Sequence, residues 1–292
     1  MATISGVITA MATPFDDGER VDVDAGRRLA RHLIENGSHG LVVNGTTGES
    51  PTTDDAEKLE LLAAVKDEVG AEATIIAGAG SNDTAHSVEL ATASTEAGAD
   101  ALLAVTPYYN KPNEAGLRGH YEAIAAVTDL PLILYNIPSR SVVNMEPAFM
   151  AELAASVDNI VAVKQANSDQ LQPIPGLDLL AGNDDVFLRC LEMGGTGGIL
   201  VASHVVGLQM RAVYEAVASG DASRAQEIDE PLHVVYDAMG VTTNPIPVKE
   251  ALALLGIASA RMRLPLVGAD DAQRASIRAA LESVGALAAS AG

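Results

Sequence analysis

The chain has 292 residues, of which 48% are hydrophobic, and its formal net charge is −21. This length suits one large domain with an appendage, and the acidic balance makes nucleic acid and anionic membranes poor partners. No apolar run approaches the roughly 20 residues of a membrane span, and the N-terminus does not show the pattern of a secretion signal. The single cysteine, Cys190, cannot form an internal disulfide. We therefore expect a cytoplasmic protein.

Eight short apolar runs with strand character recur along the chain, with helix-periodic runs between them. The first six begin about 30 residues apart, which is the length of one strand–helix unit. Such runs are typical of parallel strands that are buried on both faces. Eight units favour a closed (β/α)8 TIM barrel, with an open doubly wound sheet as the second choice. The predicted strands are residues 6–9, 40–43, 74–77, 101–105, 132–135, 160–163, 177–181 and 198–201.

Capping residues mark the ends of two predicted helices. Thr53 is expected to cap a helix that stops at Gly70, and Asn82 or Asp83 to cap the next one, which ends at residues 97–98. These side chains carry the oxygen that accepts a backbone N–H in the first turn of a helix.

The pattern after the last strand is helical. No Gly/Ser-rich or Pro-rich linker precedes this part, so its helices are expected to pack on the barrel. We divide the chain into a barrel catalytic domain, residues 1–220, and a C-terminal helical domain, residues 221–292. The predicted helices are residues 205–219, which close the barrel, and then 222–239, 247–255 and 270–289.

Lys164 follows the buried run Ile-Val-Ala-Val and lies where a strand runs out. Apolar surroundings disfavour the charged form of a lysine, so a fraction becomes free amine and can attack a carbonyl. The alternative is a lysine whose stem packs on the sheet while its head reaches solvent.

The chain has five lysines, and the other four lack this setting. Lys58 and Lys66 lie in a polar, helix-periodic stretch and are expected to be solvated. Lys111 lies in a loop, and Lys249 lies where a helix begins. Only Lys164 combines an apolar approach with the end of a strand.

In a barrel of this kind the active site lies at the C-terminal ends of the strands. The second strand is followed by Asn-Gly-Thr-Thr-Gly-Glu-Ser, residues 44–50. Gly45 and Gly48 permit a tight turn in which Thr46 and Thr47 offer hydroxyl and N–H groups to an anion. An ordinary Gly/Thr turn fits this stretch equally well.

Three of the six tyrosines, Tyr108, Tyr109 and Tyr135, lie at the ends of the fourth and fifth strands. A tyrosine is most often a core aromatic, but this clustering at the rim favours phenol groups that relay protons. Arg140 follows the fifth strand, and its planar guanidinium is suited to bind a carboxylate. The alternative is an arginine in a surface salt bridge.

Other motifs argue against nucleotide and metal sites. The stretch 78–83 has Asp where G-x-G-x-x-G requires its last glycine, so it predicts no dinucleotide site. The glycine-rich stretch 194–198 precedes the eighth strand and predicts a tight turn. The histidines lack the spacing of metal ligands, and Cys190 is expected to be a buried packing thiol.

Five motifs follow one another along the chain: G-T-T-G-E-S at 45–50, P-Y-Y-N-K-P at 107–112, Y-N-I-P-S-R at 135–140, V-K at 163–164 and N-P-I-P-V-K at 244–249. Together and in this order they resemble the dihydrodipicolinate synthase family of the N-acetylneuraminate lyase-like class I aldolases. The resemblance covers the chain from end to end and is more specific for the superfamily than for the substrate. It implies a (β/α)8 barrel with a small C-terminal helical domain, in a homotetramer built from tight dimers.

The resemblance also implies a reaction and its catalytic residues. Lys164 matches the lysine that forms a Schiff base with pyruvate, and the resulting enamine attacks L-aspartate 4-semialdehyde to give 4-hydroxy-tetrahydrodipicolinate. Tyr135 matches the acid/base beside the imine, and Thr46 the hydroxyl that links it to a second tyrosine. Tyr109 matches that second tyrosine, which reaches into the site of the neighbouring subunit. No metal or organic cofactor is needed.

The same resemblance implies the groups that bind the substrates. Thr46 and Thr47 would hold the carboxylate of pyruvate, and Arg140 that of the semialdehyde. Gly182 and Ile199 match backbone contacts near the imine. Such donors would allow a very acidic protein to bind two anions.

Three departures from the family pattern stand out. Ser141-Val142 replaces the common Thr-Gly, and Gln-Ala-Asn-Ser follows the lysine at 165–168. His86 occupies the position of an acidic residue that binds the effector's amine in lysine-inhibited members, although Asn82 and Tyr108 are kept. We therefore expect weak or absent inhibition by lysine.

Three other functions were weighed. A pyruvate aldolase that acts on a sugar acid or another 2-oxo acid would share Lys164 and Tyr135 but need not have Tyr109 or Arg140. A phosphate-binding barrel isomerase would need a glycine-rich loop after strand seven or eight, and Gly-Asn-Asp-Asp at 182–185 is too acidic for that. A catalytically inactive binding barrel would retain the reactive side chains only by coincidence.

Overall fold

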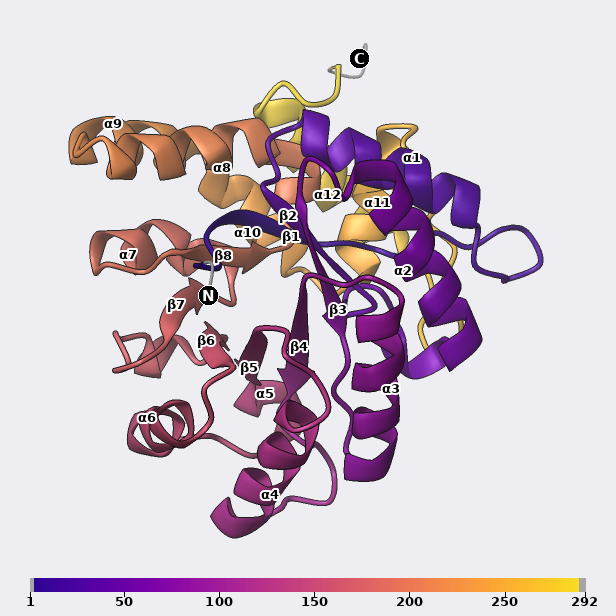
Figure 1. Ribbon diagram of the computed structural model, residues 1–292. Helices are drawn as coiled ribbons and strands as arrows, with labels where there is room; N and C mark the ends of the chain where they lie inside the picture. The colour runs from indigo at the N-terminus through magenta and orange to yellow at the C-terminus, as the bar shows by residue number, and fades with distance from the viewer. Residues whose placement is uncertain (1–2, 289–292) are drawn as a thin grey trace.

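The computed structural model describes residues 3–288, and eight parallel strands form a closed barrel at its centre (Figure 1). Each strand pairs with the next along the chain, and β8 pairs with β1. The predicted (β/α)8 barrel is confirmed, and no predicted strand end is off by more than two residues. The strands are β1 Gly6–Ala10, β2 Gly40–Val43, β3 Thr74–Gly78, β4 Ala101–Val105, β5 Leu132–Asn136, β6 Ile160–Gln165, β7 Asp178–Ala181 and β8 Gly197–Leu200.

Helices surround the barrel on its outside (Figure 1). The β6–β7 connection is an exception, because it holds only the 3-10 turn η2, Ser168–Gln170. A four-residue helix, α5, Pro138–Ser141, directly follows β5. The other helices up to the end of the barrel are α1 Val23–Glu35, α2 Asp55–Val69, α3 Thr84–Glu96, α4 Glu114–Ala125, α6 Pro147–Ser156, α7 Phe187–Glu192 and α8 Ser203–Ala218.

The predicted helix caps are partly right. Asp83 caps α3, as expected, by accepting the N–H of Ala85. The prediction that Thr53 caps α2 is wrong: the cap is Asp54, which exchanges hydrogen bonds with Glu57 in a capping box. The reciprocal pair satisfies two otherwise unpaired backbone donors, which Thr53 with Ala56 at the third helical position cannot do.

The C-terminal helices pack on the barrel, as predicted: α9 lies on α8, and α12 lies on α10 and α11. The predicted helix 222–239 is interrupted by the 3-10 turn η4, Glu230–Leu232, because Pro231 lacks the N–H that an α-helix needs. The helix predicted to reach Ala289 ends at Ser283, and Ala289 itself lies outside the described residues. The division at residue 220 stays a prediction. The helices are α9 Ala222–Asp229, α10 His233–Met239, α11 Ile246–Leu254 and α12 Asp271–Ser283.

Two apolar clusters form the core, and the alternation of side chains along each strand separates them. On β5, Leu132 and Leu134 face the surrounding helices, whereas Ile133 and Tyr135 face the barrel interior. The barrel interior is therefore filled with side chains at its lower layers. This arrangement leaves space only at its C-terminal mouth.

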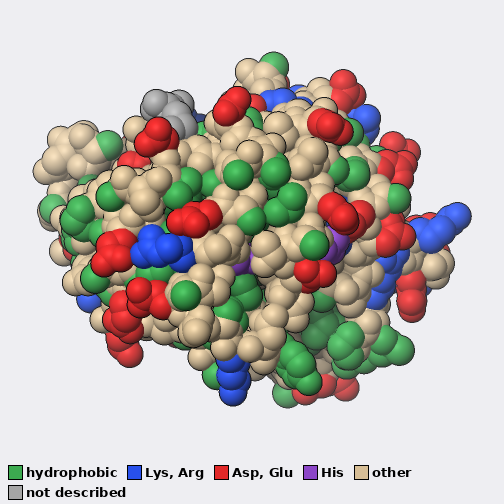
Figure 2. Space-filling model, turned by 60° about the horizontal axis from the view of Figure 1, so that its bottom comes forward, with side chains coloured by type: hydrophobic (Ala, Val, Ile, Leu, Met, Phe, Trp, Pro, Cys, Tyr) green, Lys and Arg blue, Asp and Glu red, His purple; other side chains and the backbone are tan. Residues whose placement is uncertain are grey.

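The surface carries the excess of acidic groups. Figure 2 shows acidic side chains spread over the face that it draws, with basic ones fewer and not gathered into a patch. Within residues 3–288, no helix has both the length and the apolar composition to cross a membrane.

The seam between β1 and β8 generates a first prediction. A Cβ on Gly197 would lie 2.2 Å from the carbonyl oxygen and 2.5 Å from the nitrogen of Gly6, so backbone would have to move. We expect Gly197→Ala to lower the free energy of unfolding by about 1–3 kcal/mol, measured in urea. The control is Gly119→Ala in α4, where a Cβ meets nothing within 4 Å and helix propensity adds up to ~1 kcal/mol. Equal loss in both variants would contradict the prediction.

Candidate active site

A cavity of about 460 Å³ opens at the C-terminal mouth of the barrel. Ligands bind at this face in barrels of this type because the loops after the strands surround it. Six of the eight predicted site residues line the cavity: Thr46, Thr47, Tyr135, Arg140, Lys164 and Gly182.

Lys164 lies on β6 inside the barrel, and its surface is only 5% exposed. The strand register pairs it with Tyr135 on β5 and with Leu180 on β7. Its Nζ lies 4.4 Å from the centroid of the Tyr135 ring. The amine is therefore held against an aromatic face and near a phenol that can exchange protons with a bound substrate.

Burial alone does not distinguish Lys164 from the other lysines. The expectation that Lys58 is solvated is wrong: it is 5% exposed, and its Nζ donates to Asp55 at 3.0 Å. Lys249 is 1% exposed, and its Nζ is paired with Glu49 at 2.5 Å. Lys164 has no carboxylate within ion-pair distance in the part of the chain that the structure describes. Its nitrogen thus remains available to a ligand.

Asp184 lies in the wall of the cavity, where the Lys164 charge acts on its carboxyl. One of its oxygens accepts the N–H of Val201 at 2.9 Å and that of Ala202 at 3.1 Å. Burial raises the pKa of this carboxyl to about 6. The two hydrogen bonds and the Lys164 charge act in the opposite direction and lower the pKa, but burial has the larger effect. The carboxylate occupies the start of α8, where other barrels bind phosphate. Sequence reasoning named Gly182 in the segment 182–185 but gave Asp184 no role.

Thr46 and Thr47 lie in a loop between two residues with left-handed backbone. These are Asn44, with φ of 62°, and Glu49, with φ of 54°. Thr47 is buried, and its hydroxyl accepts a hydrogen bond from the side chain of Asn244 at 2.9 Å. The Thr47 hydroxyl hydrogen is therefore free to point at an anion in the cavity.

Arg140 reaches the cavity from α5. Its Nη2 donates to the carbonyl oxygen of Asn244 at 3.2 Å and to the hydroxyl of Thr243 at 3.4 Å. The remaining N–H groups of the guanidinium can take a carboxylate. Sequence reasoning assigned no role to Asn244, although it lay in one of the matching motifs, because its loop lies far from both partners in the chain.

The segments that depart from the family pattern are held by internal hydrogen bonds. The Ser141 hydroxyl is buried and donates to the carbonyls of Ile137 and Val143. The Gln165 side-chain oxygen accepts from Asn136 and from the backbone of Asn167. Both hydrogen-bond sets fix the backbone next to the cavity.

Two predicted site residues do not line the cavity. Tyr109 is 87% exposed and has positive φ, in the loop after β4. Ile199 is buried on β8 in the same barrel-interior cluster as Tyr135. Within one chain, Tyr109 thus stands apart from the other residues predicted to be catalytic.

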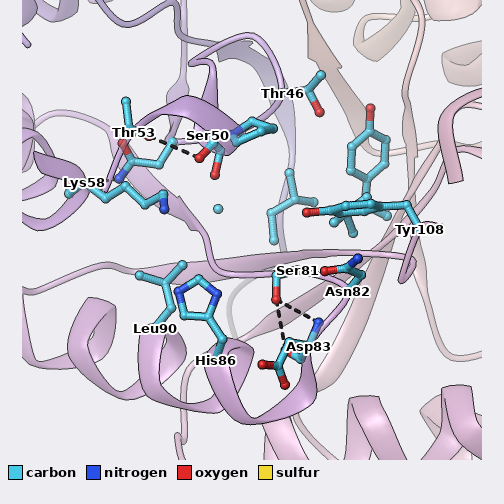
Figure 3. A pocket seen from close by; sticks show the side chains of 18 of the residues that line it. Thr46, Ser50, Thr53, Lys58, Ser81, Asn82, Asp83, His86, Leu90 and Tyr108 are labelled. Atoms are coloured by element: carbon cyan, nitrogen blue, oxygen red, sulfur yellow. Dashed lines mark hydrogen bonds between the residues drawn. The ribbon is translucent and has the colours of Figure 1, made fainter. Parts of the chain in front are cut away.

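A second cavity, of about 600 Å³, adjoins the first, and the two share wall residues that include Thr46, Tyr135 and Arg140. In Figure 3, Lys58 and His86 face it from two sides, from α2 and from α3. His86 Nε2 lies 2.8 Å from Asp55, which also accepts from Lys58. All three carboxylates in the wall are thus engaged within the chain: those of Asp54, Asp55 and Asp83.

No group of three or more His, Cys, Asp and Glu side chains within residues 3–288 is arranged to hold a metal ion. Cys190 is buried, as predicted, and burial raises the pKa of its thiol to about 12. The glycine-rich stretch before β8 forms the predicted turn between α7 and the strand.

Comparison with known proteins gives a consistent result. The sequence pattern of the Dihydrodipicolinate synthetase family matches residues 3–284. The 4-hydroxy-tetrahydrodipicolinate synthase of Moorella thermoacetica is 45% identical over 288 residues, which cover 96% of this chain and 98% of the relative.

Two solved structures superpose over almost the whole chain. The dihydrodipicolinate synthase of Thermotoga maritima has a TM-score of 0.95 and 38% identity, covering 98% of this chain and 100% of its own. The enzyme of Cyanidioschyzon merolae, solved with lysine bound, has a TM-score of 0.93 and 40% identity, covering 97% and 99%.

Proposed function

The chain belongs to the dihydrodipicolinate synthetase family, and on this premise we propose how its cavity condenses pyruvate with L-aspartate 4-semialdehyde. The product is 4-hydroxy-tetrahydrodipicolinate, on the path to diaminopimelate and lysine. One observation carries the proposal: a buried lysine without a carboxylate partner stands beside a tyrosine ring at the barrel mouth.

Lys164 starts the reaction. Its Nζ adds to the ketone carbon of pyruvate, and the ketone oxygen leaves as water, so that a protonated imine forms. Thr46 and Thr47 hold the pyruvate carboxylate with hydroxyl and N–H donors. The backbone at Gly182 and Ile199 borders the imine.

Tyr135 acts as the general acid and base. The imine acidifies the methyl group of pyruvate, and loss of a methyl proton gives the enamine. Its carbon attacks the aldehyde of the semialdehyde, and the aldehyde oxygen takes up a proton and becomes the hydroxyl group. Thr46 links Tyr135 to a second phenol, Tyr109, so that protons can leave and return. Arg140 binds the semialdehyde carboxylate.

The substrate's own amine completes the cycle. It attacks the imine carbon, the bond to Lys164 breaks, and the ring closes while the lysine amine is regenerated. Because the protein itself supplies the covalent chemistry, we propose that neither a metal nor an organic cofactor takes part. We also propose that the protein acts in the cytoplasm.

A second candidate is a pyruvate aldolase that acts on a sugar acid or another 2-oxo acid. Lys164 and Tyr135 would serve such an enzyme equally. Arg140 favours the synthase, because it offers a carboxylate site at the outer part of the cavity. Turnover of pyruvate with each aldehyde separates the two candidates.

We propose that the active form is a homotetramer, a dimer of dimers. The support is Tyr109, whose side chain is 87% exposed and does not line the cavity of its own chain. A neighbouring subunit can supply the phenol that a single chain leaves out. Sedimentation of a fully active monomer would rule this out.

The covalent step yields a direct prediction. Lys164→Ala should nearly abolish turnover, because no other amine of residues 3–288 is placed against the Tyr135 ring. Borohydride reduction with pyruvate should label wild-type protein at Lys164 alone, as mass mapping can determine. Labelling of the buried Lys58 or Lys249, or turnover by the variant at the wild-type rate, would disprove the assigned role.

Tyr109→Phe tests the proton relay. We expect kcat to fall by roughly 100-fold, the lower range for a lost acid/base group. Because phenylalanine keeps the aromatic ring and only the hydroxyl is lost, the free energy of unfolding should change by less than about 0.5 kcal/mol. Tyr214→Phe, on the outer helix α8, is the control and should retain the wild-type kcat. Equal kcat in both variants would contradict the role.

Feedback by lysine should be weak. In the second cavity, Lys58 repels an ammonium group, and Asp55 is already shared by Lys58 and His86. We expect half-inhibition only above about 1 mM lysine, measured at fixed substrate concentrations. His86→Glu should lower that concentration, since it restores an acidic partner. Inhibition of the wild type well below this concentration would refute the prediction.

A further inference from the structure

A segment of the C-terminal part of the chain, residues 243–249, contacts the loop that carries Thr46 and Thr47. We call this segment the brace. The brace contacts two residues of the cavity wall, Thr47 and Arg140, and also Glu49. Asn244 donates to Thr47, and its carbonyl accepts from Arg140. Lys249 pairs with Glu49, the residue that ends the loop.

The Lys249–Glu49 contact is more deeply buried than the other ion pairs of the described chain. Each side chain is 1% exposed, and Nζ lies 2.5 Å from Oε1. Lys249 also lies 4.3 Å from the centroid of the Phe15 ring. The second oxygen of Glu49 accepts the N–H of Arg263 at 3.2 Å. Glu49 is therefore fixed from two directions by the C-terminal part of the chain.

A buried ion pair of this kind is weak evidence of stabilisation. Burial lowers the pKa of the Lys249 amine, although the Glu49 charge acts in the opposite direction. Buried ion pairs often contribute less to stability than apolar side chains of the same size. Their best-attested use is to fix one arrangement among several.

The backbone at Glu49 needs such a constraint. Its φ of 54° and ψ of 38° are left-handed, which costs a non-glycine residue about 1–2 kcal/mol. Backbone of this kind persists only where the surroundings enforce it. Thr47 lies two residues before Glu49, so a change of backbone at Glu49 would turn Thr47 away from the cavity.

We propose that Lys249 is a positioning residue, which holds Glu49 in its left-handed turn and thereby orients Thr46 and Thr47 toward the carboxylate of pyruvate. The inference rests on the proposed function of the cavity. It concerns the first substrate, since imine formation requires the pyruvate carboxylate to be in place.

Lys249→Met tests this role, because it keeps the length of the side chain and removes the charge. We measure the pyruvate concentration that gives half of the maximal rate of borohydride trapping at Lys164, without the second substrate. It should rise roughly 10- to 100-fold, as expected for a misplaced binding group. Equal half-saturation in variant and wild type would overturn the proposal. If wild-type protein is not trapped at all, the proposed function fails instead.

Arg274→Met is the matched control. Arg274 on α12 pairs with Glu250, the residue that follows Lys249 on α11, and Glu250 is buried like Glu49. Both variants leave one buried carboxylate without its ion-pair partner, so both should lower the melting temperature. Only Lys249→Met should weaken the trapping of pyruvate. If the pyruvate concentration for half-maximal trapping rose equally in the control, general destabilisation would explain the effect, and the proposal would be overturned.

The double variant Glu49→Gln/Lys249→Met covers the case in which Lys249→Met does not fold. It removes both charges, so the penalty of an unpaired buried carboxylate disappears. We expect its melting temperature to return toward the wild-type value while half-saturation stays raised. Recovery of both quantities would mean that the pair only balances charge, and the proposal would be wrong.

Discussion

The register of the closed barrel is the constraint on which the site depends. It makes Lys164 and Tyr135 direct neighbours on adjacent strands, at the layer where the packed interior gives way to the cavity. A shift of either strand by one residue would turn its own side chain outward, among the helices, and separate the two. In the seam between β1 and β8, the backbone of Gly6 lies too close to Gly197 for a Cβ at that position. The same strand pairing that closes the barrel therefore also sets the register of the site.

Electrostatics reconcile an acidic protein with anionic substrates. Its charge of −21 is spread over the surface, and exposed charges are largely screened beyond about 10 Å at ordinary salt concentrations. The cavity itself gathers local donors: Arg140, the threonine hydroxyls and backbone N–H groups. Asp184 occupies the helix start that could otherwise attract a phosphate. The cavity thus offers the guanidinium of Arg140 and two threonine hydroxyls to the carboxylates of the proposed substrates.

The C-terminal helices belong to the active site as much as the barrel does. Their segment 243–249 contacts Arg140, Thr47 and Glu49, so the residues proposed to bind both substrates depend on it. The family resemblance marked this segment by its motif but gave no physical reason for it. The contacts supply one, because they join the binding loop to a packed scaffold.

The sequence by itself determined the eight strands, the barrel, the buried thiol and five residues of the cavity wall, because apolar periodicity and the places where strands end are local properties; Gly182 came from the family resemblance alone. It misjudged Lys58 and the cap of α2, since the burial of a helix face and the exchange of cap hydrogen bonds depend on neighbours. It assigned no role to Glu49, Lys249 or Asp184. Only the tertiary structure pairs residues 200 positions apart, and no periodicity in the chain records which distant charges meet when the helices close over the barrel.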